Sequence, residues 1–400
     1  MTTRPFVSSF SGVALLLLLC LAAASHADQA EAESKGKPVM IGAIYSLSGS
    51  QASLGRPSLK GSTLAVEQIN ARGGLLGHRV ELIALDGGSD PAVVAKETRQ
   101  LVHIPGLSAI TGLSDTTMVL AAAPIAEKAR MVFLTSGATS PRVPIEFPKY
   151  YFMACFGDNT QAAAGAEYGF STLGAKTAYL LFDETTDYTV LLAGYFKERY
   201  LQLGGQIVGE DTYAGGATTF AAQIAKIKAL GAPPDMLYIA SGPDEIGPLV
   251  KQLRKAGVDE PVFGGDGYDT PLLLQIAGAA ANDVYFTTHA LFDPAQASPL
   301  QKEFIAAYQA RFGTPPESSF AGLGYDAVNL LAAAIEGAGS AKQKVIIGAL
   351  EATQGFPGVT GTISFAPGVH IPEKQVTIVR IKDGALTLAA IITPQEVPSP

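Results

Sequence analysis

The sequence predicts an α/β protein built from two doubly wound, Rossmann-like lobes. Two observations support this prediction. The chain has 400 residues, which is enough for two domains that each bury a core. Short β-branched runs also alternate with longer amphipathic or alanine-rich runs, first from Val39 and again from Asp158. Such alternation is typical of βα units on parallel sheets, and its restart predicts a second sheet.

The first 27 residues have the features of a secretory signal peptide. Arg4 gives a basic start, residues 13–24 form an apolar run that is short for a membrane span, and Ser25-His26-Ala27 offers a small–x–small cleavage pattern. We therefore expect a periplasmic or otherwise extracytoplasmic protein whose mature chain begins near Asp28. A membrane anchor and lipidation at Cys20 are alternatives. The second is disfavoured because three leucines, not small residues, precede Cys20.

Composition excludes several classes of partner. The chain has 36 acidic and 28 basic residues, and this excess of negative charge argues against a nucleic acid or an anionic membrane surface as partner. Removal of the signal peptide would leave Cys155 as the only cysteine. The mature chain is therefore expected to lack an internal disulfide.

The first run of βα units extends to about residue 135. Asp90 is suited to cap a helix that starts at Pro91. We expect strands over Val39–Tyr45, Val80–Leu85, Ala109–Thr111 and Val132–Thr135, and helices over Ser58–Ala71, Pro91–Val102 and Thr117–Lys128.

The second run starts at Asp158, which with Gln161 resembles a capping box for a helix to Thr172. We expect strands over Ala178–Phe182, Gln206–Val208, Met236–Ala240 and Pro261–Gly264, and helices over Val190–Leu203, Phe220–Leu230 and Glu245–Ala256.

The last third departs from this alternation. We expect helices from Ser298 to about Arg311, over Phe320–Gly337 and over Lys342–Ala352, followed by strands over Thr360–Phe365, Gln375–Ile381 and Leu386–Ile391. The tight turn at Lys382-Asp383-Gly384 predicts an antiparallel end. The tail Pro394–Pro400 is expected to be frayed.

Motifs of catalysis and of cofactor binding are missing from the sequence. None of the histidines has a metal-ligand neighbour at helical spacing, and neither a G-x-S-x-G elbow nor a P-loop occurs. No metal and no cofactor are therefore expected, and an enzyme is the weakest hypothesis because no acid, base or nucleophile can be named.

Hydroxyl and glycine residues follow two predicted strands of the first half. Residues 111–117 (TGLSDTT) and 135–140 (TSGATS) each lie after a strand. The carboxyl ends of parallel strands form the ligand crevice in open α/β sheets. A helix N-terminus there offers free N–H groups. These loops could bind a carboxylate without an arginine; ordinary helix capping by Ser114, Thr116 or Thr117 is the alternative.

In the second half, Asp266 follows a predicted strand and could pair with a ligand ammonium. A turn or helix cap is its alternative role. Tyr188 follows the strand that ends at Phe182 and could cover the crevice, or be a half-exposed tyrosine without function.

These segments, in their order and spacing, resemble the periplasmic leucine/isoleucine/valine-binding proteins, which bind hydrophobic amino acids and amides for ABC importers. The resemblance extends over nearly all of the mature chain. It rests on Ile41-Gly42-Ala43, Ser48-Gly49, Gly55, Gly61 to Gly77 with Ile69-Asn70-Ala71-Arg72-Gly73-Gly74, Asp86, Asp90-Pro91, Gly264-Gly265-Asp266-Gly267 and Gly324-Tyr325-Asp326-Ala327.

The resemblance implies two lobes joined by a hinge of three crossovers, with the ligand between them. The expected division is 38–157 plus 290–374 for the N-terminal lobe and 158–289 plus 375–393 for the C-terminal lobe. The implied ligand-binding residues are Leu54, Ser114, Thr116, Gly137, Ala138, Thr139, Tyr188, Asp266 and Tyr325, with Asp158 near the hinge. Thr116, Gly137 and Thr139 would hold a carboxylate, and Asp266 an ammonium.

One departure from the family leaves the ligand open. Gly242 stands where branched-chain binders have an aromatic residue, which implies a larger or reshaped pocket. The leading expectation is a monomeric, non-catalytic binder of a small hydrophobic amino acid that delivers it to an ABC importer permease. An aromatic or aliphatic carboxylate or an amide is a second ligand hypothesis, and a sensory ligand-binding module is a third hypothesis.

Overall fold

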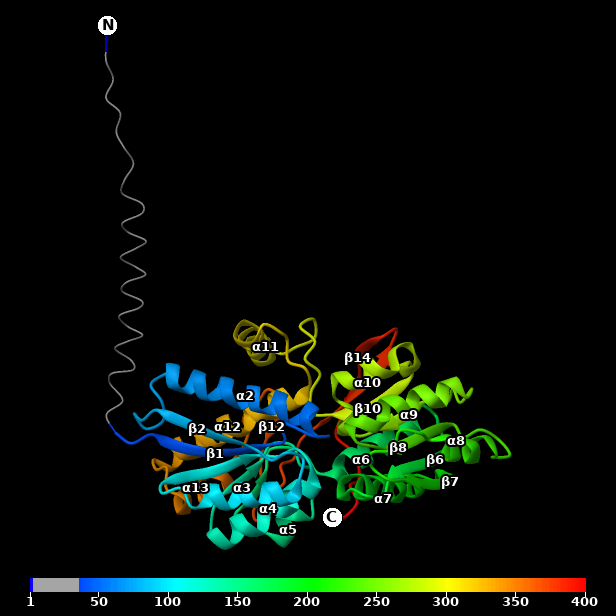
Figure 1. The fold of residues 1–400 in the computed structure, drawn as a ribbon, viewed down its shortest axis with the longest axis horizontal. Helices are drawn as coiled ribbons and strands as arrows, with labels where there is room; N and C mark the ends of the chain where they lie inside the picture. The colour runs from blue at the N-terminus through cyan, green and yellow to red at the C-terminus, as the bar shows by residue number, and fades with distance from the viewer. Residues whose placement is uncertain (3–35) are drawn as a thin grey trace.

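The computed structural model describes residues 1–2 and 36–400, and the predicted signal peptide lies mostly outside these residues. The molecule is elongated, with two α/β lobes side by side (Figure 1). The predicted fold class of two parallel-sheet lobes is confirmed. None of the described helices is both long enough and apolar enough to cross a bilayer.

The first lobe is built on a fully parallel five-stranded sheet with the order β2-β1-β3-β4-β5. Its strands are β1 (Val39–Tyr45), β2 (Val80–Asp86), β3 (Leu107–Gly112), β4 (Phe133–Thr135) and β5 (Tyr151–Met153). Both faces of its central strands β1 and β3 are buried, so their sequences do not show the regular apolar–polar alternation of a half-exposed strand. Its helices are α2 (Ala52–Ala71), α3 (Pro91–Val102), α4 (Thr116–Ala129) and α5 (Val143–Glu146), joined late in the chain by α11 (Pro299–Phe312), α12 (Ser319–Ala338) and α13 (Gln343–Glu351).

The second lobe contains a seven-stranded sheet with the order β14-β13-β10-β9-β8-β6-β7. The strands are β6 (Thr177–Asp183), β7 (Gln206–Tyr213), β8 (Met236–Ala240), β9 (Val262–Gly264), β10 (Val284–Thr288), β13 (Val376–Lys382) and β14 (Ala385–Ile392). The predicted antiparallel end is confirmed, because β13 pairs antiparallel with both β10 and β14. The covering elements are α6 (Asp158–Glu167), η1 (Tyr168–Thr172), α7 (Asp187–Gln202), α8 (Ala221–Lys228), α9 (Pro243–Lys255), η2 (Asp266–Tyr268), α10 (Pro271–Ala277) and η3 (Gly278–Ala281).

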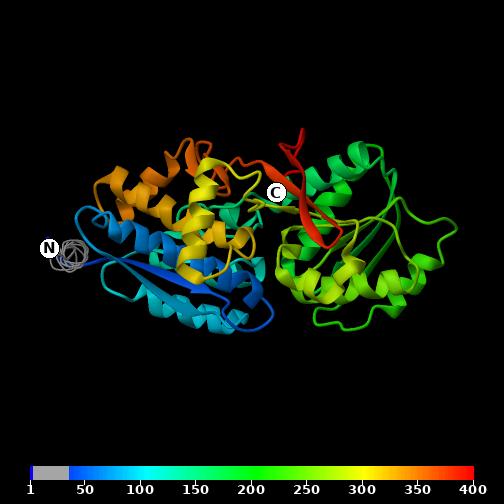
Figure 2. The same ribbon diagram turned by 90° about the horizontal axis from the view of Figure 1, so that it is seen from above.

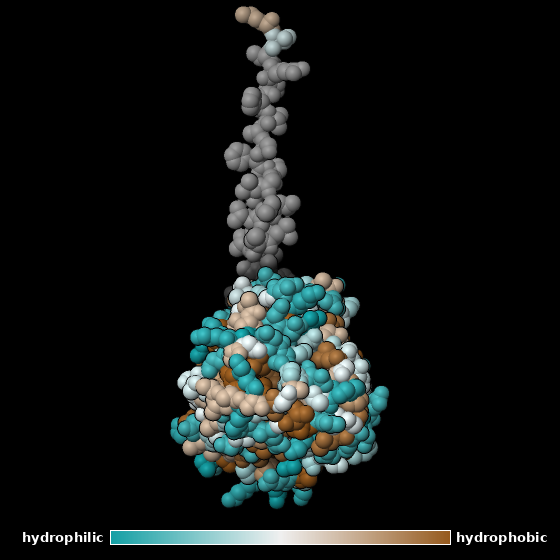
Figure 3. All heavy atoms as spheres, turned by 90° about the vertical axis from the view of Figure 1, so that its right-hand side faces the viewer, coloured by the Kyte–Doolittle hydropathy of each residue, from teal (hydrophilic) through white to brown (hydrophobic). Residues whose placement is uncertain are grey.

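The chain passes between the lobes three times. It leaves the first sheet after β5, returns after β10 to form α11 to α13, and crosses again before β13. A small antiparallel ribbon of β11 (Phe356–Gly358) and β12 (Gly361–Ile363) precedes the last crossing. Figure 2 shows these connections between the two lobes. Seen from the far end of the second lobe, hydrophilic and smaller hydrophobic groups are interspersed on the surface (Figure 3).

Helices α2 and α12 pack unusually closely in the first lobe. A Cβ atom at Gly61 would lie 1.8 Å from the Ala321 carbonyl oxygen, and one at Gly324 would lie 1.9 Å from that of Ser58. The small side chains also allow hydrogen bonds between the helices, for example from the Ser58 hydroxyl to the Phe320 carbonyl at 3.1 Å. This contact attaches the late helices to the first lobe, although they are remote in sequence.

Several expectations about local structure are corrected. Helix α2 begins at Ala52 rather than Ser58, with Pro57 inside it. Asp158 is the first residue of α6 and not its cap, since Gly157 is the N-cap and no side chain caps the helix. The strand expected over Thr360–Phe365 is limited to β12. Strands β5 and β10 were not expected.

The C-terminal tail is docked rather than frayed. Arg199, which is 5% exposed, pairs with Glu167 at 2.7 Å and with Glu396 in the tail at 2.8 Å. Glu167 also accepts the backbone N–H of Gln395 at 2.9 Å. Asn159 donates to the Pro398 carbonyl at 2.9 Å. These long-range contacts hold residues 395–398 against α6 and α7.

The close contact of α2 and α12 makes Gly324 sensitive to substitution. In Gly324→Ala the new methyl group would overlap Ser58, so we expect the free energy of unfolding to fall by more than about 2 kcal/mol. Gly337 on the same helix is the matched control. No atom lies within 4 Å of the position that a Cβ atom would take there, so Gly337→Ala should raise stability by about 0.5–1 kcal/mol. Thermal unfolding followed by circular dichroism separates the two, and equal effects would contradict the packing argument.

Candidate ligand-binding cleft

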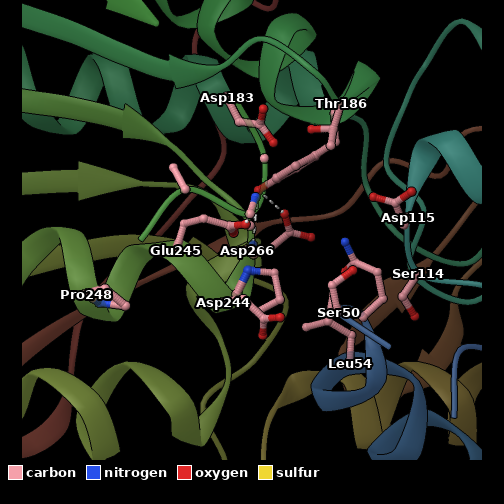
Figure 4. A pocket seen from close by; sticks show the side chains of 18 of the residues that line it. Ser50, Leu54, Ser114, Asp115, Asp183, Thr186, Asp244, Glu245, Pro248 and Asp266 are labelled. Carbon is pink, nitrogen blue, oxygen red and sulfur yellow. Dashed lines mark hydrogen bonds between the residues drawn. The ribbon is translucent and has the colours of Figure 1, made fainter. Parts of the chain in front are cut away.

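A cavity of about 580 Å³ lies between the two lobes. The side chains that line it face each other across the space, with Leu54, Ser114 and Asp115 on one side and Asp183, Asp244, Glu245 and Asp266 on the other (Figure 4). The lining comprises Ser50, Gln51, Leu54, Ser114, Asp115, Thr139, Asp183, Thr186, Tyr188, Gly215, Gly216, Ala217, Thr218, Gly242, Pro243, Asp244, Glu245, Pro248, Asp266, Gly267 and Phe320.

The topology of the sheets explains why these residues meet. In both lobes the parallel strands direct their carboxyl ends toward the cleft, where the connections to the following helices supply the lining. Ser114 and Asp115 follow β3, Thr139 follows β4, and Asp266 follows β9. The cleft is therefore assembled from residues scattered along the sequence but adjacent at two sheet edges.

The first lobe contributes hydroxyl groups to the cavity wall. The Ser114 hydroxyl oxygen is buried and has no hydrogen-bond partner, and the Thr139 side chain on the cavity wall is only 2% exposed. Asp115 is the N-cap of α4 and accepts the backbone N–H of Met118 at 3.1 Å. This wall offers hydrogen-bond donors near a helix N-terminus, an arrangement suited to an anionic oxygen.

The second lobe presents Asp266 in a buried hydrogen-bond network. Its Oδ1 accepts from the Gln161 amide and from the Tyr188 hydroxyl, both at 2.9 Å, and its Oδ2 lies 3.1 Å from His289 Nε2. The Gln161 oxygen in turn accepts from the Asp266 backbone N–H and the Thr287 hydroxyl. The carboxylate is thus fixed in place while its residue still lines the cavity.

The cavity wall is strongly acidic. It carries five carboxyl groups and, among the described residues, no lysine, arginine or histidine. Asp183 is 3% exposed, and its Oδ1 accepts from the amide and hydroxyl of Thr185 at 2.8 and 2.6 Å. Glu245 accepts the Gly216 N–H at 2.8 Å. Burial raises the pKa of both Asp244 and Glu245, as expected for carboxyl groups that lack a cationic partner.

Two other acids near the cleft have strongly shifted pKa values. Burial raises the pKa of Asp115 to about 6, in spite of hydrogen bonds from the amides of Met118 and Thr117. Burial and the nearby charge of Asp266 raise the pKa of Asp158 to about 8. Burial lowers the pKa of His289, which favours its neutral form.

The structure brings five of the expected residues together on the wall. Leu54, Ser114, Thr139, Tyr188 and Asp266 all line the cavity. Asp158 lies immediately behind, at the first crossing between the lobes; its backbone N–H donates to the Thr139 carbonyl at 2.7 Å.

Thr116, Gly137 and Ala138 do not line the cavity. The Gly137 amide, which was expected to bind a carboxylate, donates to the Leu113 carbonyl at 3.2 Å, and the Ala138 amide donates to the Thr135 hydroxyl at 3.1 Å. The hydroxyl of Thr116 is buried and unpaired. The two amides therefore hold the loop in shape instead of facing the cavity.

The expectation for Tyr325 is wrong. Its hydroxyl donates to the Gln68 side chain on α2 at 2.6 Å, and the residue borders a separate cavity of about 290 Å³. Helix α12 starts at the cleft and runs away from it, so Phe320 in its first turn lines the cavity in place of Tyr325.

Sequence reasoning missed part of the site. Asp183 directly follows the strand predicted over Ala178–Phe182, and Glu245 begins a predicted helix, but neither was given a binding role. Both belong to the same connections after strands that revealed the other residues. At Gly242, a Cβ atom would lie 3.1 Å from the Glu245 Oε2 atom, so the glycine leaves room for this carboxylate beside the cavity.

The profile of the family described as periplasmic binding protein matches residues 38–385. The chain belongs to the periplasmic binding protein family. This periplasmic binding protein is 27% identical, over 94% of its length and 97% of the relative's, to Leu/Ile/Val-binding protein homolog 3 of Brucella melitensis.

Solved structures of the family share the fold. The branched-chain amino acid transporter substrate binding protein LivJ of Streptococcus pneumoniae, in complex with isoleucine, is 33% identical with a TM-score of 0.83, covering 90% of this chain and 100% of its own. A solute binding protein of an ABC transporter from Rhodopseudomonas palustris, in complex with 3,4-dihydroxybenzoic acid, is 25% identical with a TM-score of 0.79, covering 90% and 99%.

Within the described part of this periplasmic binding protein, no group of three or more histidine, cysteine, aspartate or glutamate side chains is arranged to hold a metal ion. The chemistry that the cleft offers is hydrogen bonding and charge: hydroxyl donors and one carboxyl group from the first lobe, and four carboxyl groups from the second.

The raised pKa of Asp115 predicts a pH-dependent effect of Asp115→Asn. Because the folded pKa, about 6, exceeds the unfolded value near 3.9, the stability contributed by the protonated acid is complete below about pH 4 and lost as the pH rises through 6. Asparagine stays neutral and can still accept the Met118 N–H. The variant should therefore gain about 1–3 kcal/mol relative to the wild type between pH 4 and 7, measured by denaturant unfolding.

Asp86 is the control for this effect. Burial opposes ionisation there, but hydrogen bonds from Gly88, Ser48 and Leu47 outweigh it and lower the pKa of Asp86. Asp86→Asn should therefore be less stable than the wild type by a constant amount above about pH 4, and the difference should shrink as the pH falls below 4. A pH-independent difference for Asp115→Asn would contradict the burial of that carboxyl group.

Proposed function

We propose that this protein is the solute-binding component of an ABC importer and that it binds an α-amino acid, with the branched-chain type first, in the cleft without catalysing a reaction. One observation supports this ligand class above the others: hydroxyl donors on one lobe face a buried carboxylate, Asp266, across the cavity. An amino acid carries both complementary charges. Its carboxylate would bind Ser114 and Thr139, and its ammonium would bind Asp266.

The acidic wall favours a ligand with an amine over a simple carboxylic acid. Five carboxyl groups line the cavity without a basic side chain among the described lining residues. A ligand ammonium would supply a cation to this wall, whereas a carboxylate alone would add one more negative charge. The isoleucine bound to the Streptococcus pneumoniae relative agrees with this choice.

The side chain of the ligand would contact an apolar part of the cavity. Leu54 and Phe320 from the first lobe and Pro243 and Pro248 from the second belong to the lining. Burial of a hydrophobic side chain against them would contribute about 25 cal/mol per Å². Gly242 also lines the cavity and has no side chain that would narrow it, so the preferred side chain can be larger than that of leucine.

An aromatic carboxylate is the second candidate. The relative from Rhodopseudomonas palustris binds 3,4-dihydroxybenzoic acid. In this chain the hydroxyls of Ser114 and Thr139 could bind such a carboxylate, and Phe320 could stack on the ring. Asp266 would then have no ligand cation to bind.

The mechanism we infer is a shift of population between open and closed lobes. A ligand that contacts both lobes stabilises the closed form. The lobes already touch beside the cavity, where the Thr117 hydroxyl donates to Asp187 at 3.2 Å. The closed form would be recognised by a permease in the membrane, and export would follow the predicted signal peptide.

Replacement of Asp266 by asparagine distinguishes the two ligand classes. The charge is lost but the shape is kept. Asp266→Asn should therefore lower the affinity for an amino acid about 10- to 100-fold, because a charge-assisted hydrogen bond contributes about 1.5–3 kcal/mol. The same change should leave the affinity for an aromatic carboxylate unchanged or raise it slightly. Candidate ligands are found by thermal shift and quantified by calorimetry. Full amino-acid affinity in the variant would contradict the assigned ammonium site.

Replacement of Thr139 by valine tests the carboxylate site. Valine keeps the shape and removes the hydroxyl donor, so the affinity for any carboxylated ligand should fall about 10- to 100-fold. Thr98→Val is the matched control, because Thr98 is also buried in the first lobe but its hydroxyl bonds within α3 and does not line the cavity. Unchanged affinity in Thr139→Val would refute this part of the site.

A further inference from the structure

Two buried carboxyl groups share one amide donor behind the cleft. The Gln161 Nε2 atom lies 3.0 Å from Asp158 Oδ1 and 2.9 Å from Asp266 Oδ1. Asp158 is 0% and Asp266 2% exposed. Two carboxylates held this close in a medium of low polarity repel each other strongly. Such a pair favours a state in which one of the two groups is protonated and the other is charged.

The hydrogen bonds show which of the two acids carries the charge. Asp266 is surrounded by donors, because Gln161, Tyr188 and His289 all contact its oxygens. Asp158 interacts with the Gln161 amide and the Thr139 hydroxyl, but its Oδ2 atom is buried with no hydrogen-bond partner. Donors stabilise an anion, so the negative charge belongs on Asp266 and a proton on Asp158.

No described cation contacts this pair. His289 Nδ1 is buried without a partner, which fits a neutral ring whose Nε2–H donates to Asp266. The Lys374 ammonium donates instead to the Ala154 carbonyl at 3.1 Å and the Thr360 hydroxyl at 2.7 Å. The other titratable groups that interact with the pair are acids, phenols or a thiol: Asp115, Tyr151, Cys155, Tyr188, Tyr195, Tyr238 and, toward Asp266, Asp269.

We propose that Asp158 carries a proton in the ligand-free protein and releases it to the solvent when a ligand ammonium reaches Asp266. This inference rests on the proposed function, because it requires a ligand with an amine. The O–H bond of the Asp158 carboxyl breaks and the proton passes to the buffer. The arriving ammonium replaces it as the positive charge of the pair.

The direction of the pH effect follows from this exchange. The pKa of Asp158 is raised to about 8 by burial and then by the charge of Asp266. A ligand ammonium bound to Asp266 offsets the charge of that carboxylate. The second cause is then removed, and the pKa of Asp158 falls. Binding then releases a proton, so the affinity for an amino acid rises as the pH approaches 8, by up to tenfold per pH unit, and levels off above it until the ligand ammonium itself deprotonates.

Calorimetry with isoleucine at pH 7.5, in phosphate and in Tris buffer, measures the proton directly. The wild type should release roughly half to one proton per ligand, and Asp158→Asn, which keeps the acceptor for Gln161, should release about none while still binding. Asp86→Asn is the control and should keep the release, because Asp86 does not line the cavity and hydrogen bonds from Gly88, Ser48 and Leu47 lower its pKa. Unchanged release in Asp158→Asn would overturn the inference and leave the proposed function intact.

A second measurement needs no ligand. In protein labelled with ¹³C at aspartate carboxyl carbons, one resonance should titrate near pH 8 and be missing in Asp158→Asn. If every carboxyl group titrates below pH 7, the inference is wrong whatever the ligand. If this resonance is found but no amino acid binds, the proposed function fails and, with it, the coupling to an ammonium.

Discussion

The three chain crossings between the lobes are joined by two buried polar side chains, and the geometry of the cleft depends on them. Gln161 lies in the helix that follows the first crossing and contacts Thr287 on β10, just before the second. Lys374 lies at the third crossing and contacts the Ala154 carbonyl at the first. Because Gln161 also holds Asp266, the position of this ligand-facing acid is fixed by the connections between the lobes.

Burying polar groups between the lobes costs free energy unless every one of them is hydrogen-bonded. An unpaired buried amide or ammonium destabilises a protein by several kcal/mol, whereas a fully bonded one imposes a single arrangement. All three polar bonds of the Gln161 oxygen and nitrogen to Asp266 and Thr287 are within 3.1 Å. An apolar residue could fill the same volume, but it could not specify where the carboxylate points. The bonded amide of Gln161 thus defines the orientation of the site.

The parts of the fold that follow from local signals could be predicted from the sequence. Asp90 caps α3 through the amides of Ala92 and Val93, and Ser298 and Gln301 form the capping box of α11. These signals act within four residues of the chain. By contrast β5 and β10 are short, fully buried strands without alternation, and the C-terminal tail is ordered by Arg199, which is remote in sequence. Such elements depend on tertiary contacts that a local pattern does not contain.

The same division applies to the cleft. Thr139 and Asp266 could be found because the carboxyl ends of parallel strands are where ligands bind. Phe320 comes from a helix that enters the first lobe only after the second crossing, so no local pattern assigns it to the site. The pairing of Asp158 with Asp266 is likewise a product of folding, since one amide joins residues that lie on separate elements. What the sequence lacks is therefore the environment of each charge, and in a cleft with an acidic wall that environment decides whether a carboxyl group binds a cation, caps a helix or holds a proton.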